Sequence, residues 1–328
     1  MRRLGFPVPI SILLFLALTF AGAYYVRRGM LERAMVEALK TEDEGMIRSL
    51  LDWWPCPVNA TAMVPQKGVF GIEIEMPRTP FMWAMERYKL DVALACVLKG
   101  ADVKSREPFR IVPLNWAVMF NDKALVRALL DRGADPNEAD SVGNTALNWV
   151  VCCDPRDMHG EEMISMLLAA GANPRTRGAG GRTPLHRVAM TGGPKVVELL
   201  LEHGADVNAT DDNGSTPLYG AGKKETVYLL LARGALVNVR NCAGSTPLHE
   251  AAEGFDKEAV EALIERGADV NCRDNKGLTP LDRAKAHAAG EIADWVEYPA
   301  DIRRQMMDYD RRCKDEVIRL LLKAGARE

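Results

Sequence analysis

The chain has 328 residues, of which 48% are hydrophobic and 27% are charged. These fractions are ordinary for a folded protein. The formal net charge of −3 excludes the strong positive field on which nucleic-acid binding depends. We therefore expect no nucleic-acid partner.

Residues 1–28 differ in character from the rest of the chain. No charged residue stands between positions 4 and 26, and arginines flank this stretch on both sides. An uncharged run of this length can cross a bilayer as a single helix. Alternatively, cleavage after Ala23 would make it a secretion signal. We favour the retained anchor because Arg27 and Arg28 would follow the cut site and hinder export.

The side of the membrane on which the rest of the chain lies follows from the flanking charges. The basic residues on the two flanks favour, by a small margin, a cytoplasmic body. The seven cysteines agree, because their number is odd and their spacing forms no disulfide framework. The alternative is a secreted or periplasmic protein that is released after signal cleavage.

A short motif recurs along the remaining chain. Thr-Pro-Leu-His occurs at 183–186 and again at 246–249, with related sequences on both sides. The copies begin near residues 79, 112, 145, 183, 216, 246 and 279. The threonine can cap a helix and the proline suits the first helical position. A spacing near 33 residues predicts one small unit stacked many times.

A second signal recurs in register with the first. Gly-Ala follows an apolar run in every copy, with the glycine at positions 100, 133, 171, 204, 234, 267 and 325. Glycine can take the left-handed conformation that ends a helix. The two signals together predict pairs of short helices that are separated by polar turns.

This pattern resembles the ankyrin repeat family, from about Leu31 to the C-terminus. The resemblance implies an all-α solenoid of helix–turn–helix units with short β-hairpin loops, and protein recognition on its concave side. It also implies that His186 and His249 are structural histidines, which tie neighbouring units through hydrogen bonds.

The expected organisation has three parts. Residues 1–28 form the hydrophobic anchor or signal helix, and residues 29–78 form a degenerate capping repeat with a loop. Residues 79–328 hold the seven repeats, and the last repeat carries a long insertion at about 287–313.

The repeat that begins at Thr216 is shorter than its neighbours. Gly220 and Gly222 stand where its inner helix and the following turn are expected. Glycine is a poor helix former, and each unit of a stack is held mainly by its neighbours. This repeat is therefore predicted to open more easily than the others.

In the resembled family, the position two residues after the motif leucine lies on the inner helix and faces the concave groove. With Met119 from the same helix face, the predicted partner contacts are Trp83, Trp116, Met119, Trp149, Arg187, Glu250 and Arg283. Tryptophan is enriched among the residues that dominate binding energy. The alternative is that the tryptophan rings pack on neighbouring repeats as part of the framework.

The sequence carries no pattern typical of a catalytic site. It has no glycine-rich phosphate loop after a strand and no paired zinc-ligand spacing. Cys152, Cys153 and His159 lie together in an insertion of the third repeat, and such side chains can bind a metal. Adjacent cysteines rarely point at one metal, so we favour a plain loop. We expect a protein or peptide partner, with no catalysis, no cofactor and no small-molecule substrate.

Overall fold

The computed structural model describes seven stretches of the chain, which are residues 30–52, 58–67, 73–103, 112–151, 160–191, 193–286 and 300–327. The hydrophobic segment 4–26 lies outside the described residues, as do the Cys152, Cys153 and His159 loop and most of the 287–313 insertion. Within the stretches that the structure describes, no helix is both long enough and apolar enough for a membrane span.

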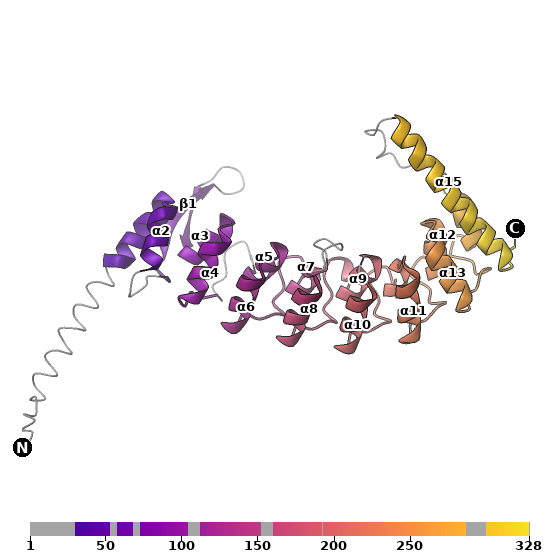
Figure 1. Ribbon diagram of the computed structural model, residues 1–328, viewed down its shortest axis with the longest axis horizontal. Coiled ribbons are helices and arrows are strands. Elements are labelled where there is room, and N and C mark those ends of the chain that lie inside the picture. The colour runs from indigo at the N-terminus through magenta and orange to yellow at the C-terminus, as the bar shows by residue number, and fades with distance from the viewer. Residues whose placement is uncertain are drawn as a thin grey trace, which may run out of the picture. The chain divides into compact units, whose positions relative to one another are not determined.

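The chain divides into two compact units, Met1–Asp135 and Pro136–Glu328. The first unit opens with a helix at residues 30–41. Its later elements are α2 (Glu44–Leu51), β1 (Ala62–Lys67), β2 (Glu73–Arg78), α3 (Pro80–Glu86), α4 (Leu90–Leu98), α5 (Pro113–Met119) and α6 (Lys123–Asp131) (Figure 1). The two strands form an antiparallel hairpin in which Ala62 pairs with Arg78.

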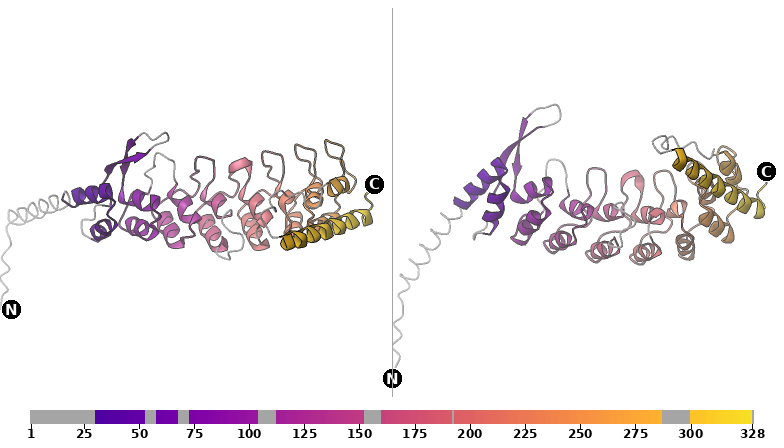
Figure 2. Two further views of the ribbon diagram at one scale, coloured as in Figure 1. Left: turned by 90° about the horizontal axis from the view of Figure 1, so that it is seen from above. Right: turned by 45° about the horizontal axis from the view of Figure 1, so that its top comes forward.

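The second unit continues the helix pairs, as Figure 1 shows. Its first elements are α7 (Ala146–Val150), α8 (Gly160–Ala169), η2 (Ala179–Gly181), α9 (Pro184–Thr191) and α10 (Pro194–Glu202). They are followed by η3 (Pro217–Gly220), α11 (Lys224–Ala232), α12 (Pro247–Glu253), α13 (Lys257–Glu265), α14 (Pro280–Ala286) and α15 (Ala300–Lys323). The loops between these repeats project from one side of the unit (Figure 2).

Local sequence explains where the helices begin and end. The hydroxyl of Thr79 accepts a hydrogen bond from the amide of Met82 at 3.2 Å, so the motif threonine caps α3. At the other end of a repeat, Gly204 has a φ of 90°. The next amide, that of Ala205, donates to the carbonyl of Leu200 at 2.9 Å. The predicted helix starts and glycine stops are therefore confirmed at these positions.

Two buried histidines join neighbouring repeats, as the resemblance implied. Nδ1 of His186 accepts the backbone amide of Thr183 at 3.2 Å, so the ring proton resides on Nε2. Nε2 then donates to the carbonyl of Ser215 in the next repeat at 3.0 Å. His249 makes the same link to Leu278 at 3.0 Å.

An asparagine in the loop that follows an outer helix provides a second link in several repeats. The side-chain amide of Asn208 donates to the carbonyl of Gly234 at 2.9 Å, and its oxygen accepts the amide of Leu236 at 3.0 Å. Asn59 bonds in the same way to the carbonyl of Gly100 and to the amide of Asp102. The segment before the first full repeat thus carries the same inter-repeat bonds.

Candidate binding hollow on the inner helices

Three of the loops that precede an inner helix are each organised by one carboxylate. Oδ1 of Asp211 accepts the amides of Asn213 and Ser215, both at 2.9 Å. Asp140 and Asp274 bond in the same way to amides two and four residues later in their own loops. In all three loops this leaves the second oxygen, Oδ2, for a donor from outside the loop.

In two of these repeats the inner helix supplies a donor to that second oxygen. Nε1 of Trp149 donates to Oδ2 of Asp140 at 2.8 Å. Nε and Nη2 of Arg283 donate to Oδ2 of Asp274 at 3.0 and 2.6 Å. Both donors are predicted groove residues, so Trp149 and Arg283 serve the framework of their own repeats.

The short repeat lacks this donor. Gly220 occupies the equivalent position and has no side chain. Oδ2 of Asp211 faces Nε of Arg182 at 3.6 Å, which is an ion pair but too long for a hydrogen bond. The Asp211 side chain is nevertheless only 4% exposed.

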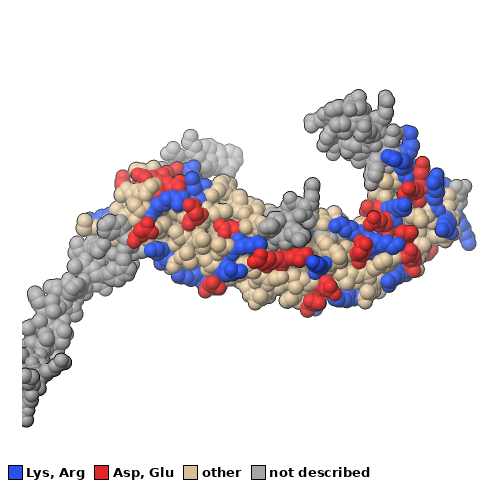
Figure 3. Space-filling view, viewed as in Figure 1, with Lys and Arg blue, Asp and Glu red and all other residues tan. Residues whose placement is uncertain are grey.

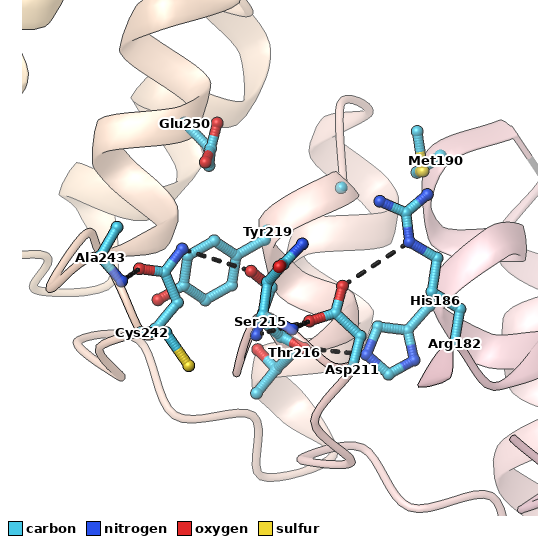
Figure 4. A pocket seen from close by; sticks show the side chains of 13 residues that line it. Arg182, His186, Met190, Asp211, Ser215, Thr216, Tyr219, Cys242, Ala243 and Glu250 are labelled. Atoms are coloured by element: carbon cyan, nitrogen blue, oxygen red, sulfur yellow. Dashed lines mark hydrogen bonds and ion pairs between the residues drawn. The ribbon is translucent and has the colours of Figure 1, made fainter. Parts of the chain in front are cut away.

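The missing side chain and the short 3₁₀ turn η3 leave a space of about 600 Å³, which we call the Gly220 hollow. Three successive repeats contribute its principal lining residues, which are Arg182, His186, Met190, Asp211, Tyr219, Gly220, Cys242 and Glu250. These residues belong to inner helices and to loops, and Figure 4 shows Tyr219 between Met190 and Glu250. The hollow therefore opens on the inner-helix side of the second unit.

Tyr219 forms one wall of the Gly220 hollow and is held by its hydroxyl. The oxygen lies 2.8 Å from the carbonyl of Val239 and 2.6 Å from that of Ser245. Burial raises the pKa of this phenol far above its ordinary value. Tyr219 is therefore a neutral donor that fixes the loop, and its ring is presented to the hollow.

Glu250 lies at the opposite border, on α12, and its side chain is exposed. Partial burial raises the pKa of its carboxyl, and the neighbouring charge of Glu253 raises it further, while Arg283 acts in the opposite direction. Glu253 itself is paired with Arg283 at 2.5 Å. Glu250 has no hydrogen-bond or ion-pair partner for its carboxylate within the described stretches.

The predicted contacts in the first unit differ in exposure. Trp83 is 2% exposed and its Nε1 is buried without a hydrogen bond, so this ring belongs to the core. Trp116 and Met119 are half-buried. The Trp116 ring stacks on that of Tyr88 with a centroid distance of 5.3 Å, and the Phe120 ring lies 5.7 Å away. These three aromatic side chains form a partly exposed cluster, of which only Trp116 was predicted from the sequence.

Arg187 is also half-buried, and its Nε has no hydrogen bond. It does not line the Gly220 hollow. Of the predicted contacts in the second unit, only Glu250 borders that hollow. Gly220 and Tyr219 carried a signal in the sequence, since the shortened repeat places them where an inner helix is expected.

The chemistry of the hollow is that of binding. Burial lowers the pKa of the His186 imidazole, and both of its ring nitrogens are engaged in framework hydrogen bonds. Among the residues that the structure describes, no group of three His, Cys, Asp or Glu side chains could hold a metal ion. On the face shown in Figure 3, basic and acidic side chains are interspersed.

Known proteins share this repeat pattern. The family described as ankyrin repeats, in three copies, matches residues 81–177, 156–241 and 219–306. The ankyrin repeat domain of Bcl-3, a member of the IkappaB protein family, is a structural neighbour with a TM-score of 0.51 and 30% sequence identity. The match covers 63% of this chain and 93% of that domain.

Curated relatives match over shorter stretches. An ankyrin repeat protein of fowlpox virus is 36% identical over 143 residues, which are 41% of this chain and 40% of the viral protein. Protein PhlB of Serratia liquefaciens is 36% identical over 122 residues, which are 37% of this chain and 52% of that protein. The chain thus spans about half, or less, of these relatives.

Proposed function

Because the chain belongs to the ankyrin repeat family, we propose that it is a non-catalytic scaffold that holds a protein or peptide against its inner helices. The observation that carries this proposal is the Gly220 hollow, which three successive repeats line. A cavity of about 600 Å³ on an otherwise regular repeat surface is large enough for one or two side chains of a bound segment.

The residues at the border of the Gly220 hollow are exposed, which favours a protein or peptide as the bound partner. Met190 is 54% exposed beside the hollow, and Cys242 and Glu250 are exposed as well. Exposed apolar side chains that gather on a soluble surface often mark a partner site. The Tyr219 hydroxyl and the His186 ring of the lining already bond within the fold, so the exposed border residues are the groups that a bound segment can contact.

We also propose that residues 4–26 tether the scaffold to a membrane. The support is the uncharged stretch with arginines on both flanks, which lies outside the described residues. The alternative is a signal segment whose cleavage yields a secreted or periplasmic protein. The intact mass of the protein recovered from membranes tests this, because a tether retains residues 1–23 and a cleaved signal does not.

Site-specific cross-linking in the source cells tests the scaffold. The photoreactive residue p-benzoylphenylalanine replaces Met190 at the border of the hollow, or Leu236 as a control. The two positions match in character, being apolar and 54% and 57% exposed, but Leu236 does not line the hollow. We expect discrete adducts with one partner protein from position 190 and none from position 236. The same adducts from both positions would contradict a binding surface on the inner helices.

A further inference from the structure

The charges around the Gly220 hollow do not balance. Arg182 and Asp211 form an ion pair at one border. His186 is neutral because its Nδ1 accepts the backbone amide of Thr183. Tyr219 is neutral because its hydroxyl is partly buried and hydrogen-bonded to backbone carbonyls. The remaining charged lining residue is Glu250, whose carboxylate lies on the other border without a partner among the described residues. The hollow therefore carries about one net negative charge.

The chain itself shows how such a space is filled in another repeat. Arg283 stands at the position of Gly220, and its guanidinium bonds to Asp274 of its own loop and to Glu253 of the preceding inner helix. Its side chain is only 16% exposed. One guanidinium thus joins two repeats across the inner-helix side.

Gly220 has no side chain that could do the same. A Cβ atom at Gly220 would lie 2.4 Å from Cγ of Met190, so the methionine already covers the glycine backbone. Met190 and the Tyr219 ring offer apolar contacts at the hollow, and the methylene stem of a long cationic side chain packs well on such surfaces. What is missing is the cation itself.

We propose that the Gly220 hollow takes a basic side chain, an arginine or a lysine, from a segment of the partner protein, with Glu250 as its counter-charge. This inference rests on the proposed scaffold function and specifies the chemistry of the bound segment. The stem lies against Met190 and Tyr219, and the cationic end reaches Glu250. An acidic segment is disfavoured at this hollow, because it would bring a second negative charge to Glu250.

Methyl NMR of the full-length chain tests the inference without knowledge of the partner. Methionine methyls are labelled with ¹³C, and the Met190 signal is assigned from a Met190→Leu variant. The probes are N-acetyl-arginine amide, N-acetyl-lysine amide and N-acetyl-citrulline amide. Citrulline has nearly the shape of arginine but no charge. We expect saturable shifts of the Met190 methyl with arginine, lysine or both, and at least about tenfold weaker binding of citrulline, which is about 1.4 kcal/mol.

Two matched substitutions assign the effect to the border carboxylate. Glu250→Gln removes the charge at the hollow, and Glu258→Gln removes one from an exposed position on the outer helix α13. Glu250→Gln is expected to lower the affinity for the cationic probes about tenfold, and Glu258→Gln is expected to leave that affinity unchanged. Equal binding of citrulline, or no effect of Glu250→Gln, would overturn the inference.

The two experiments separate the inference from the scaffold function. Suppose that adducts with a partner form from position 190 only, but that citrulline binds as tightly as arginine and lysine. This result would refute the inference of a basic side chain and would still support the scaffold function. Selective binding of the cationic probes, together with equal adducts from positions 190 and 236, would refute the scaffold function and leave only the preference of the hollow for a basic side chain.

Discussion

The guanidinium of Arg283 lies against the carboxylate of Asp274, with Nη2 2.6 Å and Nε 3.0 Å from the same oxygen, Oδ2. The Asp274 side chain is fully buried, at 0% exposure. Nη2 also lies 2.7 Å from the hydroxyl of Ser245. A residue predicted to contact a partner is thus also a tie between an inner helix, its own loop and the preceding repeat.

We predict that Arg283→Met lowers the free energy of unfolding by about 3 kcal/mol, because it leaves a buried carboxylate without its partner. Urea denaturation followed by circular dichroism measures the change. The control is Arg233→Met, which breaks an ion pair with Glu198 whose side chains are 36% and 48% exposed. Exposed pairs contribute less than about 1 kcal/mol. Equal losses in the two variants would contradict a structural role for the Arg283 pair.

The repeat frame could be predicted from the sequence because its rules are local. A threonine before a proline caps a helix at Thr79, and a glycine ends one at Gly204, whatever the neighbouring repeats contain. The inter-repeat links of His186 and His249 recur because they depend on the repeat spacing and on a backbone carbonyl.

The hollow could not be predicted in the same way, because it depends on the lack of a side chain at Gly220 and on the neighbouring repeats. Gly220 indicated a weak inner helix, which the structure shows as the short 3₁₀ turn η3. The cavity above it depends on Met190 and Glu250 from the two neighbouring repeats. The burial of Trp83 likewise depends on the surrounding side chains. Trp116 occupies the equivalent position in the next repeat, yet it is only half-buried.

The short repeat should be the more easily opened part of the second unit. Four residues of 3₁₀ helix at η3 replace an inner helix that has eight residues at α9. We predict that backbone amides of residues 214–227 exchange hydrogen faster than those of residues 181–197, measured by mass spectrometry of the native chain. Local openings need less free energy where fewer buried contacts are lost. Equal protection of the two segments would contradict the weak repeat.

Stability should depend on pH through the two inter-repeat histidines. Burial lowers the pKa of His186 and of His249 below the ordinary value. The unfolded chain therefore binds these protons first, so the histidine contribution is complete above about pH 6.5 and declines as the pH falls below it. Protonation would also place a proton on Nδ1 opposite the amide of Thr183.

Urea denaturation at about pH 7.5 and about pH 5.5 measures this decline. The comparison variant is His186→Gln with His249→Gln, which retains polar groups but removes the titration. We expect the difference in unfolding free energy between the two pH values to become smaller in the double variant. An unchanged difference would show that other groups determine the pH dependence.

The aromatic cluster of the first unit provides the last prediction. Tyr88 and Phe120 are 59% and 37% exposed, and Trp116 stacks on Tyr88 at an interplanar angle of 17°. Once cross-linking from position 190 identifies the partner, Trp116→Ala should weaken its binding by about 2 kcal/mol, as for an aromatic residue at the centre of an interface. Isothermal titration calorimetry gives the affinity, and circular dichroism verifies the fold.

Leu98→Ala is the control for this prediction, because Leu98 is apolar and 63% exposed at the end of the outer helix α4. It should leave the affinity unchanged, since the outer helices are not part of the proposed surface. If Trp116→Ala unfolds the chain instead, the ring is a framework residue like Trp83. If both substitutions weaken binding equally, the prediction is wrong. The partner would then respond to the loss of any exposed apolar side chain and would not recognise the aromatic cluster in particular.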